Sequence, residues 1–280
     1  MLRLTEVQLP LDHPEADIRA AILARLAITD EDLLAFSIFK RSYDARKKSA
    51  ITLIYTLDVE IKNEAQVQKR LSSNRHVVPT PDTSYHFVAQ ATQGLRTRPV
   101  VIGSGPCGIF AGLILAQMGF CPIILERGKA VRERTKDTFG LWRKRVLHPE
   151  SNVQFGEGGA GTFSDGKLYS QVKDPKHYGR KVLTEFVKAD APPEIMYVSK
   201  PHIGTFRLVK MVEQMRATIE ALGGEFRFES KVDDLEIDNG RVRGVVLAGG
   251  EQIVTDHVVL AVGHSARDTF QMLYDRGVYV

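Results

Sequence analysis

The sequence predicts an α/β protein in which a Rossmann-type domain with a β-meander follows a small α+β domain. Three observations support this fold class. An apolar run at residues 100–102 leads directly into a glycine turn and a helix, as expected of a buried parallel strand that opens a βαβ unit. Short strand-like segments separated by turn residues follow one another over residues 225–254, which indicates antiparallel strands. Over residues 1–94, strands and helices alternate on the scale of a small α+β unit.

Length and composition set the class of protein. The 280 residues are 43% hydrophobic and 26% charged, as in soluble globular proteins, and this length suggests about two domains. No apolar run approaches the roughly 20 residues of a membrane span, and the start of the sequence lacks a signal-peptide pattern. The two cysteines suit a reducing compartment, so we expect a cytoplasmic protein. The net charge of +4 permits phosphate binding without arguing for it.

The predicted N-terminal domain covers residues 1–94, including a linker. Strands and helices are distinguished by the spacing of their apolar residues. The expected strands are residues 2–9, 33–40 and 49–61, and the expected helices are residues 14–27 and 64–71. Proline, glycine, serine and threonine are frequent over residues 74–98, a composition typical of a linker.

The predicted second domain covers residues 95–280, with an insertion at about residues 127–205. After the strand at 100–102, a helix is expected at 106–118, because Pro106 suits its first turn and Gly119 its end. The remaining expected elements are strands at 122–125, 225–228, 234–237, 242–247 and 252–254, a helix at 206–222, and a buried strand at 258–261. A chain that returns from a meander to a buried strand is expected to rejoin the first βαβ unit.

The strongest motif is Gly-Ser-Gly-Pro-Cys-Gly at residues 103–108, placed between a strand and a helix. Gly103 permits a tight turn, Gly105 permits close approach of a pyrophosphate, and Gly108 permits the helix to pack on the strand. The helix N-terminus then offers free N–H groups and a positive dipole end to phosphates. Glu126 ends the next strand, where a carboxylate accepts hydrogen bonds from ribose hydroxyls. This carboxylate would repel a 2′-phosphate, so the motif favours FAD or NAD over NADP.

Two later features favour FAD over NAD. The segment 258–263 follows the meander directly, as expected where the chain returns to the dinucleotide. The segment 152–167, NVQFGEGGAGTFSDGK, is too rich in glycine for a regular helix, and its backbone N–H groups could approach a flat or anionic ligand. An ordinary strand end and a flexible surface lid are the alternative interpretations.

These motifs together resemble a family of bacterial FAD-dependent dehydrogenases. The resemblance lies in GSGPCG, in Glu126-Arg127-Gly128, in the loop FGEGGAGTFSDGKL and in the stretch VVLAVGHSARDTF. The N-terminal segments KRSYDARKK and YTLDVEI are similar to that family as well, so the likeness covers nearly the whole chain. The family belongs to the NAD(P)- and FAD-dependent oxidoreductases with two dinucleotide-binding domains. Its members carry further segments after the point where this sequence stops, so we expect an N-terminal part of a longer chain.

The resemblance implies non-covalent FAD. The glycine turn would hold the pyrophosphate, the end of the next strand the adenosine ribose, and residues 158–162 would lie beside the pyrophosphate or flavin. The backbone around Val232 would reach the adenine. The implied cofactor-binding residues are Gly103, Ser104, Gly105, Pro106, Cys107, Gly108, Glu126, Arg127, Gly158, Gly159, Ala160, Gly161, Thr162, Val232, Ala261 and Gly263.

The sequence assigns no catalytic residue but offers three candidates. Lys167 could stabilise an anionic reduced flavin or simply be an exposed lysine after a turn. His202 and His264 could act as acid–base groups or serve packing. Cys107 and Cys121 do not form a CxxC pair and are expected to be small buried packing residues. No metal site is predicted, since histidines, cysteines and acids do not cluster at ligand spacing.

Two basic segments bear on polyanion binding. The stretch 129–145 is expected to be a solvated helix face, with an arginine paired to FAD phosphate as the alternative. The basic residues over 40–48 raise RNA binding as a rival, but RNA platforms usually show paired aromatic residues on strands, and only Phe36, Phe39 and Tyr55 approach this pattern. RNA is therefore not the expected partner.

The leading hypothesis is an FAD-dependent oxidoreductase that passes hydride or electrons through its flavin to or from a small-molecule substrate. NAD(P)H is the expected electron donor. The alternatives are a NAD-binding enzyme without flavin and a non-catalytic module that binds nucleotide or RNA. The substrate and the oligomeric state do not follow from the sequence.

Overall fold

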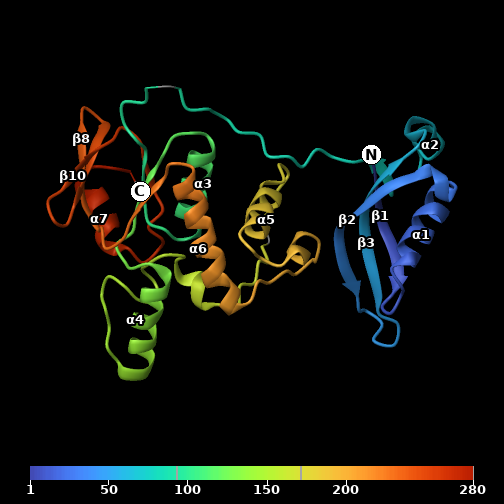
Figure 1. Cartoon of the computed structure of the whole chain (residues 1–280), viewed down its shortest axis with the longest axis horizontal. Coiled ribbons are helices and arrows are strands. Elements are labelled where there is room, and N and C mark those ends of the chain that lie inside the picture. The colour runs from blue at the N-terminus through green and yellow to red at the C-terminus, as the bar shows by residue number, and fades with distance from the viewer. Residues whose placement is uncertain (93, 171, 280) are drawn as a thin grey trace. The chain divides into compact units, whose positions relative to one another are not determined.

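The computed structural model describes residues 1–92, 94–170 and 172–279, and these residues form two compact units (Figure 1). Unit 1 consists of Met1–Tyr85, Leu168–Thr184 and Pro192–Pro201. Unit 2 consists of His86–Lys167, Glu185–Ala191 and His202–Val280. In the part of the chain that is described, no helix is long and apolar enough to cross a membrane.

Unit 1 is built on a four-stranded antiparallel sheet with the order β2-β3-β1-β4. Its elements are β1 (Leu2–Pro10), α1 (Ala16–Leu26), a 3-10 turn η1 (Asp30–Asp32), β2 (Leu33–Asp44), β3 (Thr52–Ile61), α2 (Glu64–Arg70) and β4 (Val77–Pro79). Ile18, Ile22 and Leu26 recur on one face of α1 and belong to the same buried cluster as Leu4 and Leu57 of the sheet. Burial of this apolar face fixes the helix on the sheet.

Part of the predicted insertion belongs to unit 1. The backbone N–H of Arg41 donates to the carbonyl of Tyr197 at 2.7 Å, and the N–H of Ser199 donates to the carbonyl of Arg41 at 3.0 Å. These bonds extend the free edge of β2, which satisfies backbone groups that an edge strand would otherwise leave open. The 3-10 turn η3 (Pro193–Met196) and the first part of α5 (Tyr178–Lys188) lie in the same unit. The sequence-based division at residue 94 did not anticipate this discontinuous arrangement.

Unit 2 contains a parallel sheet with the order β11-β5-β6-β7. Its strands are β5 (Val100–Ile102), β6 (Ile123–Leu125), β7 (Glu225–Arg227) and β11 (Val258–Leu260). The helices α3 (Pro106–Gln117) and α6 (Thr205–Ala221) pack together, and a Cβ atom at Gly112 would lie only 3.1 Å from Ile124 of the sheet. A small residue at position 112 therefore allows α3 to lie close to the strands.

The β-meander is present, but it begins at β8: the prediction is wrong for residues 225–227, because β7 pairs in parallel with β6. β8 (Val232–Asp238), β9 (Arg241–Leu247) and β10 (Gln252–Val254) form an antiparallel sheet, and β11 then pairs in parallel with β5. The α/β fold class with a Rossmann-type domain is thereby confirmed. Three further elements complete the unit: α4 (Val131–Lys144), a 3-10 turn η2 (Ala160–Phe163) and α7 (Arg267–Asp275).

Three details differ from the prediction. The strand at 258–260 is not buried, because β11 is an edge strand: Val258 and Val259 are half-buried and Leu260 is exposed. β2 continues to Asp44, so Arg41 lies within a strand rather than in a connecting basic patch. In addition, the segment assigned to the linker contains the short strand β4.

Candidate dinucleotide-binding cleft

The turn between β5 and α3 requires glycine at two positions. Gly103 has a φ of +99°, and a Cβ atom there would lie 2.5 Å from the carbonyl oxygen of Ala261. A Cβ atom at Gly108 would lie 1.8 Å from the carbonyl oxygen of Gly103. Both distances are far below a van der Waals contact. Gly103 therefore permits the tight turn and Gly108 the close packing of helix on strand, the two roles that the sequence motif predicts.

The start of α3 is open to a ligand. Gly105 is the N-cap residue and provides no side-chain cap, and Pro106 occupies the first turn. The N–H groups of a first helical turn have no intrahelical acceptor, and the positive end of the helix dipole lies at the same point. Cys107 follows and is exposed, and Cys121 is partly exposed. The expectation that both cysteines are buried packing residues is wrong, because neither faces the apolar core.

The carboxylate of Glu126 is already saturated by protein donors. One oxygen, Oε2, accepts from the N–H (2.8 Å) and the hydroxyl (2.7 Å) of Ser104. The other, Oε1, accepts from the N–H of Gly128 at 2.9 Å and of Gly156 at 3.0 Å. A carboxylate has about four lone-pair sites, so this buried group is fully used. Glu126 thus ties the glycine turn to the glycine-rich loop, and its predicted contact with ribose stays a prediction.

A buried arginine of α4 holds the glycine-rich loop in shape. The guanidinium of Arg134 is completely buried and donates to four backbone carbonyls at 2.7–2.8 Å, those of Asn152, Val153, Glu157 and Gly159. Burial lowers the pKa of Arg134 to about 10, so it is still a cation at neutral pH. The expectation of a solvated face is therefore wrong at Arg134, because its acceptors lie on the loop that packs against α4.

Glu157 fixes the other end of the contact between the loop and α4. Its buried Oε2 accepts from the N–H of Val131, the first residue of α4, at 2.7 Å. Its Oε1 lies 3.4 Å from Nε of Arg216 on α6. Burial raises the pKa of Glu157, which the Val131 hydrogen bond and the Arg216 charge oppose. The carboxylate thereby joins the loop, the positive end of α4 and α6.

The loop is also packed directly on the turn. The N–H of Gly158 donates to the carbonyl of Ser104 at 2.9 Å. A Cβ atom at Gly159 would lie 3.0 Å from the Cα atom of Gly105. The two glycine-rich segments are thus in backbone contact, as their shared cleft requires.

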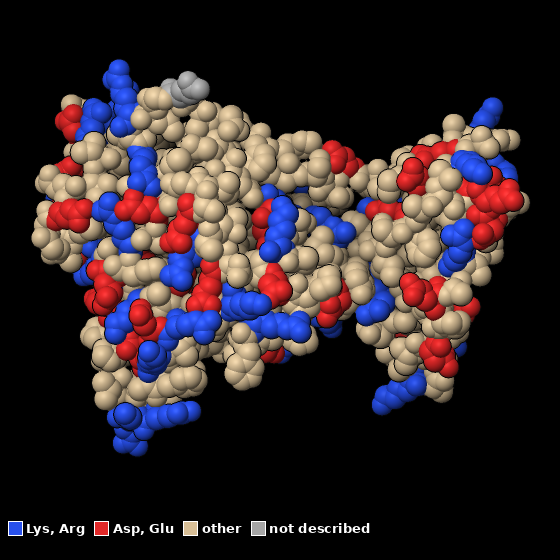
Figure 2. Space-filling view, viewed as in Figure 1, with Lys and Arg blue, Asp and Glu red and all other residues tan. Residues whose placement is uncertain are grey.

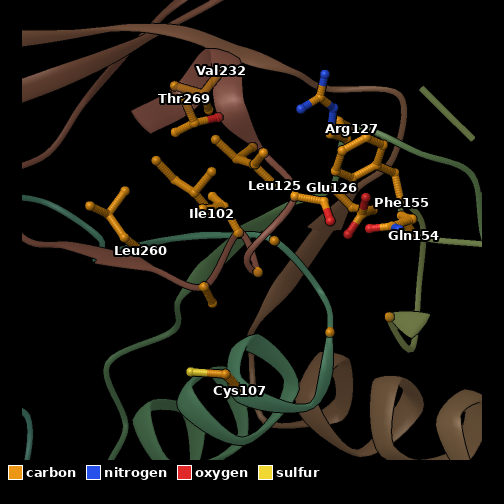
Figure 3. Close-up of a pocket in the computed structure, with 18 of the residues that line it drawn as sticks. Ile102, Cys107, Leu125, Glu126, Arg127, Gln154, Phe155, Val232, Leu260 and Thr269 are labelled. Atoms are coloured by element: carbon orange, nitrogen blue, oxygen red, sulfur yellow. The ribbon is translucent and has the colours of Figure 1, made fainter. Parts of the chain in front are cut away.

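Arg127 closes one side of the cleft. Its guanidinium pairs with Glu150 at 2.5 Å and with Asp268 at 2.8 Å, and it lies 4.2 Å over the ring of Phe155. Burial alone would lower the pKa of Arg127, but the two carboxylates outweigh it and the pKa is raised. The hydrogen bonds from Arg127, assisted by Lys231, lower the pKa of Asp268 despite its partial burial. In Figure 3, Arg127 and Phe155 lie together beside Glu126.

These elements enclose a cleft of about 470 Å³ within unit 2 (Figure 3). Its lining combines the glycine turn with apolar side chains such as Ile102, Leu125 and Leu260. The predicted cofactor residues that line it are Gly103, Gly105, Pro106, Cys107, Glu126, Arg127, Gly159, Ala160, Val232, Ala261 and Gly263. Those outside the lining are Ser104, Gly108, Gly158, Gly161 and Thr162. Ser104, Gly108 and Gly158 instead make the supporting contacts described above.

The three candidate catalytic residues separate. His264 lines the cleft, with its Nδ1 2.9 Å from the hydroxyl of Ser265. Lys167 and His202 do not line the cleft, and their backbones pair in an isolated antiparallel bridge. The side chain of Lys167 forms an ion pair with Asp165 at 3.0 Å. Lys167 and His202 are both exposed. Within the described residues, no group of His, Cys, Asp and Glu has the arrangement of a metal site.

Sequence reasoning missed several lining residues. Phe155 lies inside the glycine-rich loop and could have been found as the aromatic residue next to Gly156. Among the lining residues contributed by α7, Thr269 and Phe270 were indicated only as part of the resembling stretch VVLAVGHSARDTF, and Leu273 gave no signal. Their place depends on the turn of the chain after β11, for which the sequence offers only Gly263.

The residues fit a dinucleotide. A Cβ atom at Gly105, which lines the cleft, would meet only the Cα atom of Gly159 at 3.7 Å, so this glycine leaves the start of α3 open. That start has no side-chain cap, and the volume lies within the roughly 300–1,000 Å³ of small-ligand sites. The apolar lining suits a flat ring, and the turn suits a pyrophosphate. The fold and the cleft together define a Rossmann-type dinucleotide-binding protein.

Comparisons with known proteins narrow this class. Residues 196–279 match the family model described as FAD dependent oxidoreductase, and residues 1–60 match a domain of unknown function, DUF8436. The resemblance to FAD-dependent oxidoreductases is thereby confirmed. An uncharacterized protein of Clostridium beijerinckii is 40% identical over 277 residues, which are 99% of this chain and 51% of that protein. The chain thus spans about half the length of this relative.

Three of the solved structures that match part of this chain are the following. THI4 of Thermovibrio ammonificans is 19% identical, with a TM-score of 0.45 over 65% of this chain and 64% of that one. Glycine oxidase from Bacillus cereus is 14% identical, with a TM-score of 0.35 over 65% and 59% of the two chains. L-proline dehydrogenase from P. horikoshii is 16% identical, with a TM-score of 0.36 over 66% and 56%.

Proposed function

We propose that the cleft of unit 2 binds FAD non-covalently and that the protein is an FAD-dependent oxidoreductase. The observation that carries this proposal is that α3 begins at a glycine turn without a side-chain cap and that this turn lines the cleft. Residues 196–279, which supply other parts of the lining, match the FAD dependent oxidoreductase model. The N–H groups of the first turn of α3 would hold the pyrophosphate. Bound FAD supplies the capacity to accept and release hydride or electrons.

The protein groups around the cleft orient the cofactor. The hydroxyl of Ser104 can rotate, so it is the donor that can leave Glu126 and free one oxygen for a ribose hydroxyl. The ring of Phe155, fixed by Arg127, excludes water from one side of the cleft. His264 is the candidate proton donor at the lining.

Titration with FAD tests the proposal. The purified chain should take up one FAD, and the flavin absorption should change on binding. Anaerobic NADH and NADPH are then added, and bleaching by either identifies the donor. The full-length Clostridium beijerinckii relative serves as the comparison. If the relative binds FAD and this chain does not, the site needs the rest of the protein; if neither binds, the proposal is wrong.

The same titration separates the rival functions. A NAD-binding enzyme without flavin would bind NAD and would show no flavin absorption after free FAD is removed by gel filtration. We further propose that NAD(P)H is the electron donor, that the substrate is a small molecule and that the protein is cytoplasmic. The two free cysteines support this location.

The surface charge bears on RNA as a partner. On the face shown in Figure 2, Lys and Arg are interspersed with Asp and Glu, and basic side chains gather at the end of α4. This mixed surface favours a small ligand over RNA as the partner.

A further inference from the structure

Unit 1 contains a groove that the proposed function does not use. It has a volume of about 850 Å³ and lies between β2, the segment that leads into α5 and the segment after η3. Phe39 and Lys40 of β2, Lys173 and Arg180 near α5, and Tyr197 after η3 are among its lining residues. Residues 1–60 of this unit match a domain of unknown function, which names no ligand for the groove.

The charge of the groove is strongly one-sided. Its lining carries the cations Lys40, Lys173, Lys176 and Arg180, together with His177. Among the described lining residues, Asp174 is the sole acid. Its two oxygens accept from the N–H groups of Tyr178 (2.8 Å) and Gly179 (2.6 Å) at the start of α5. This carboxylate is therefore committed to capping the helix, and the lysines and Arg180 face the groove without a carboxylate devoted to them.

Arg180 is the cation of the groove whose charge is least compensated. It is half-buried, donates to the carbonyl of Met196 and stacks 4.7 Å over the ring of Phe39. Arg3 lies 3.5 Å over the same ring, but it has its own partner, Asp58, with bonds of 2.7 and 2.8 Å. Burial, and then the charge of Arg3, lower the pKa of Arg180, and the charge of Asp58 opposes this shift only in part. An anion in the groove would add negative charge beside Arg180.

The groove also offers exposed flat rings. Tyr169 is 61% exposed and Tyr178 is 51% exposed, and both belong to the lining. Lys200 lies 6.0 Å from the ring of Tyr169, and Lys176 lies 5.9 Å from that of Tyr178. A planar base can stack on such rings while the neighbouring ammonium groups contact its phosphate.

We propose that this groove is a second nucleotide site, which binds a small nucleotide through its phosphates and its base. Arg180, Lys173 and Lys176 contact the phosphates, and Tyr169 or Tyr178 contacts the base. The volume lies within the range of small-ligand sites, roughly 300–1,000 Å³, which favours a free nucleotide over a polynucleotide that would run beyond the groove.

The experiment uses the full 280-residue chain loaded with FAD and freed of unbound FAD by gel filtration, so that the cleft of unit 2 is filled and no free adenine dinucleotide competes for the groove. Binding of the fluorescent nucleotide mant-ADP is followed by fluorescence anisotropy. We expect saturable binding that weakens with salt and falls roughly tenfold or more in the double variant Lys173→Glu/Lys176→Glu. The matched control is Lys47→Glu/Lys48→Glu, which reverses the same two charges at exposed positions in the turn between β2 and β3, outside the lining. The control should lose less than about threefold.

Three outcomes overturn the proposal. One is the lack of saturable binding below about 1 mM nucleotide. Another is an equal loss in the two double variants, or no loss in either, because binding then comes from general charge or from another site. The third is tighter binding of a short single-stranded RNA that displaces mant-ADP.

A separate variant tests the arginine of the groove. Arg180→Met, checked by circular dichroism for retained folding, should also weaken mant-ADP binding.

Discussion

Replacement of Arg134 by methionine tests whether a buried cation shapes the cofactor loop. The methionine keeps much of the side-chain volume but removes all four hydrogen bonds to loop carbonyls. At roughly 1 kcal/mol net for each bond, the free energy of unfolding should fall by about 4 kcal/mol. Relief of the desolvated charge opposes this loss. However, Glu126 and Glu157 then lose the cation that stabilises their buried carboxylates, so the net effect remains a large destabilisation.

The chain provides a matched control two residues earlier on the same helix. Arg132 pairs with Glu213 at 2.6 Å, but its side chain is 69% exposed. Arg132→Met should therefore cost less than about 1 kcal/mol. Both variants are unfolded with urea and followed through Trp142, the single tryptophan of the sequence. Trp142 contacts Phe163, whose ring lies 4.9 Å from the Arg134 guanidinium, so it reports on this region.

Equal stabilities of the two variants would refute the reasoning, because the loop would then hold its shape without the guanidinium. Arg134→Lys provides a graded version of the test. An ammonium group is compact and cannot reach four carbonyls spread over the loop, so the lysine variant should fall between wild type and Arg134→Met. FAD affinity should follow the same order as stability.

Three shorter tests address the cleft. Gly108→Ala should abolish FAD binding and lower the free energy of unfolding by about 3 kcal/mol. The control is Gly140→Ala on α4, where the new Cβ atom meets free space, and it should be neutral or stabilising by about 0.5–1 kcal/mol. Thermal melts and FAD titration measure both variants. Bound FAD should slow alkylation of Cys107 but not of Cys121, as read by peptide mass spectrometry, and equal rates with and without FAD would place the cofactor elsewhere. The ion pairs of Asp268 lower its pKa in the folded protein below the ordinary 3.8, so they stabilise the protein above that pH, and this stabilisation is lost as pH falls below about 4. Asp268→Asn should make the free energy of unfolding, measured by urea melts, depend less on pH in this acid range. An unchanged pH dependence would argue against the ion pairs.

The parts of the site that the sequence predicted are those encoded by a local pattern. Gly103 is favoured by its positive φ and Gly108 is required by the nearby carbonyl of Gly103, and the start of α3 follows from the proline after Gly105. The two central strands of the parallel sheet, β5 and β6, are short apolar runs that are buried throughout, as at Val100 and Ile124. Because patterns of this kind depend only on residues that are close in the sequence, they predict these elements without knowledge of the fold.

The missed parts depend on contacts between distant segments. Arg134 lies in a helix with alternating charges, and nothing in its neighbours distinguishes it from the exposed Arg132. Its acceptors are backbone carbonyls 18–25 residues further along the chain, which carry no residue-type signal. The same reason explains why the pairing of Arg41 with the segment after η3 was not predicted, since 156 residues separate Arg41 from Tyr197 and backbone bonds join them.

The support of the cleft has a consequence for the cofactor. Glu126, Arg134 and Glu157 bind the two glycine-rich segments together through buried charges, and Arg134 and Glu157 do not line the cleft. A cleft held in this way keeps its N–H groups in place before the ligand arrives, so little ordering free energy is lost on binding. Affinity for FAD should therefore be more sensitive to the loss of Arg134 than to the loss of Phe155, although only the phenylalanine reaches the lining. If Phe155→Ala weakens FAD binding more than Arg134→Lys does, direct stacking rather than preorganisation dominates, and the buried network serves stability alone.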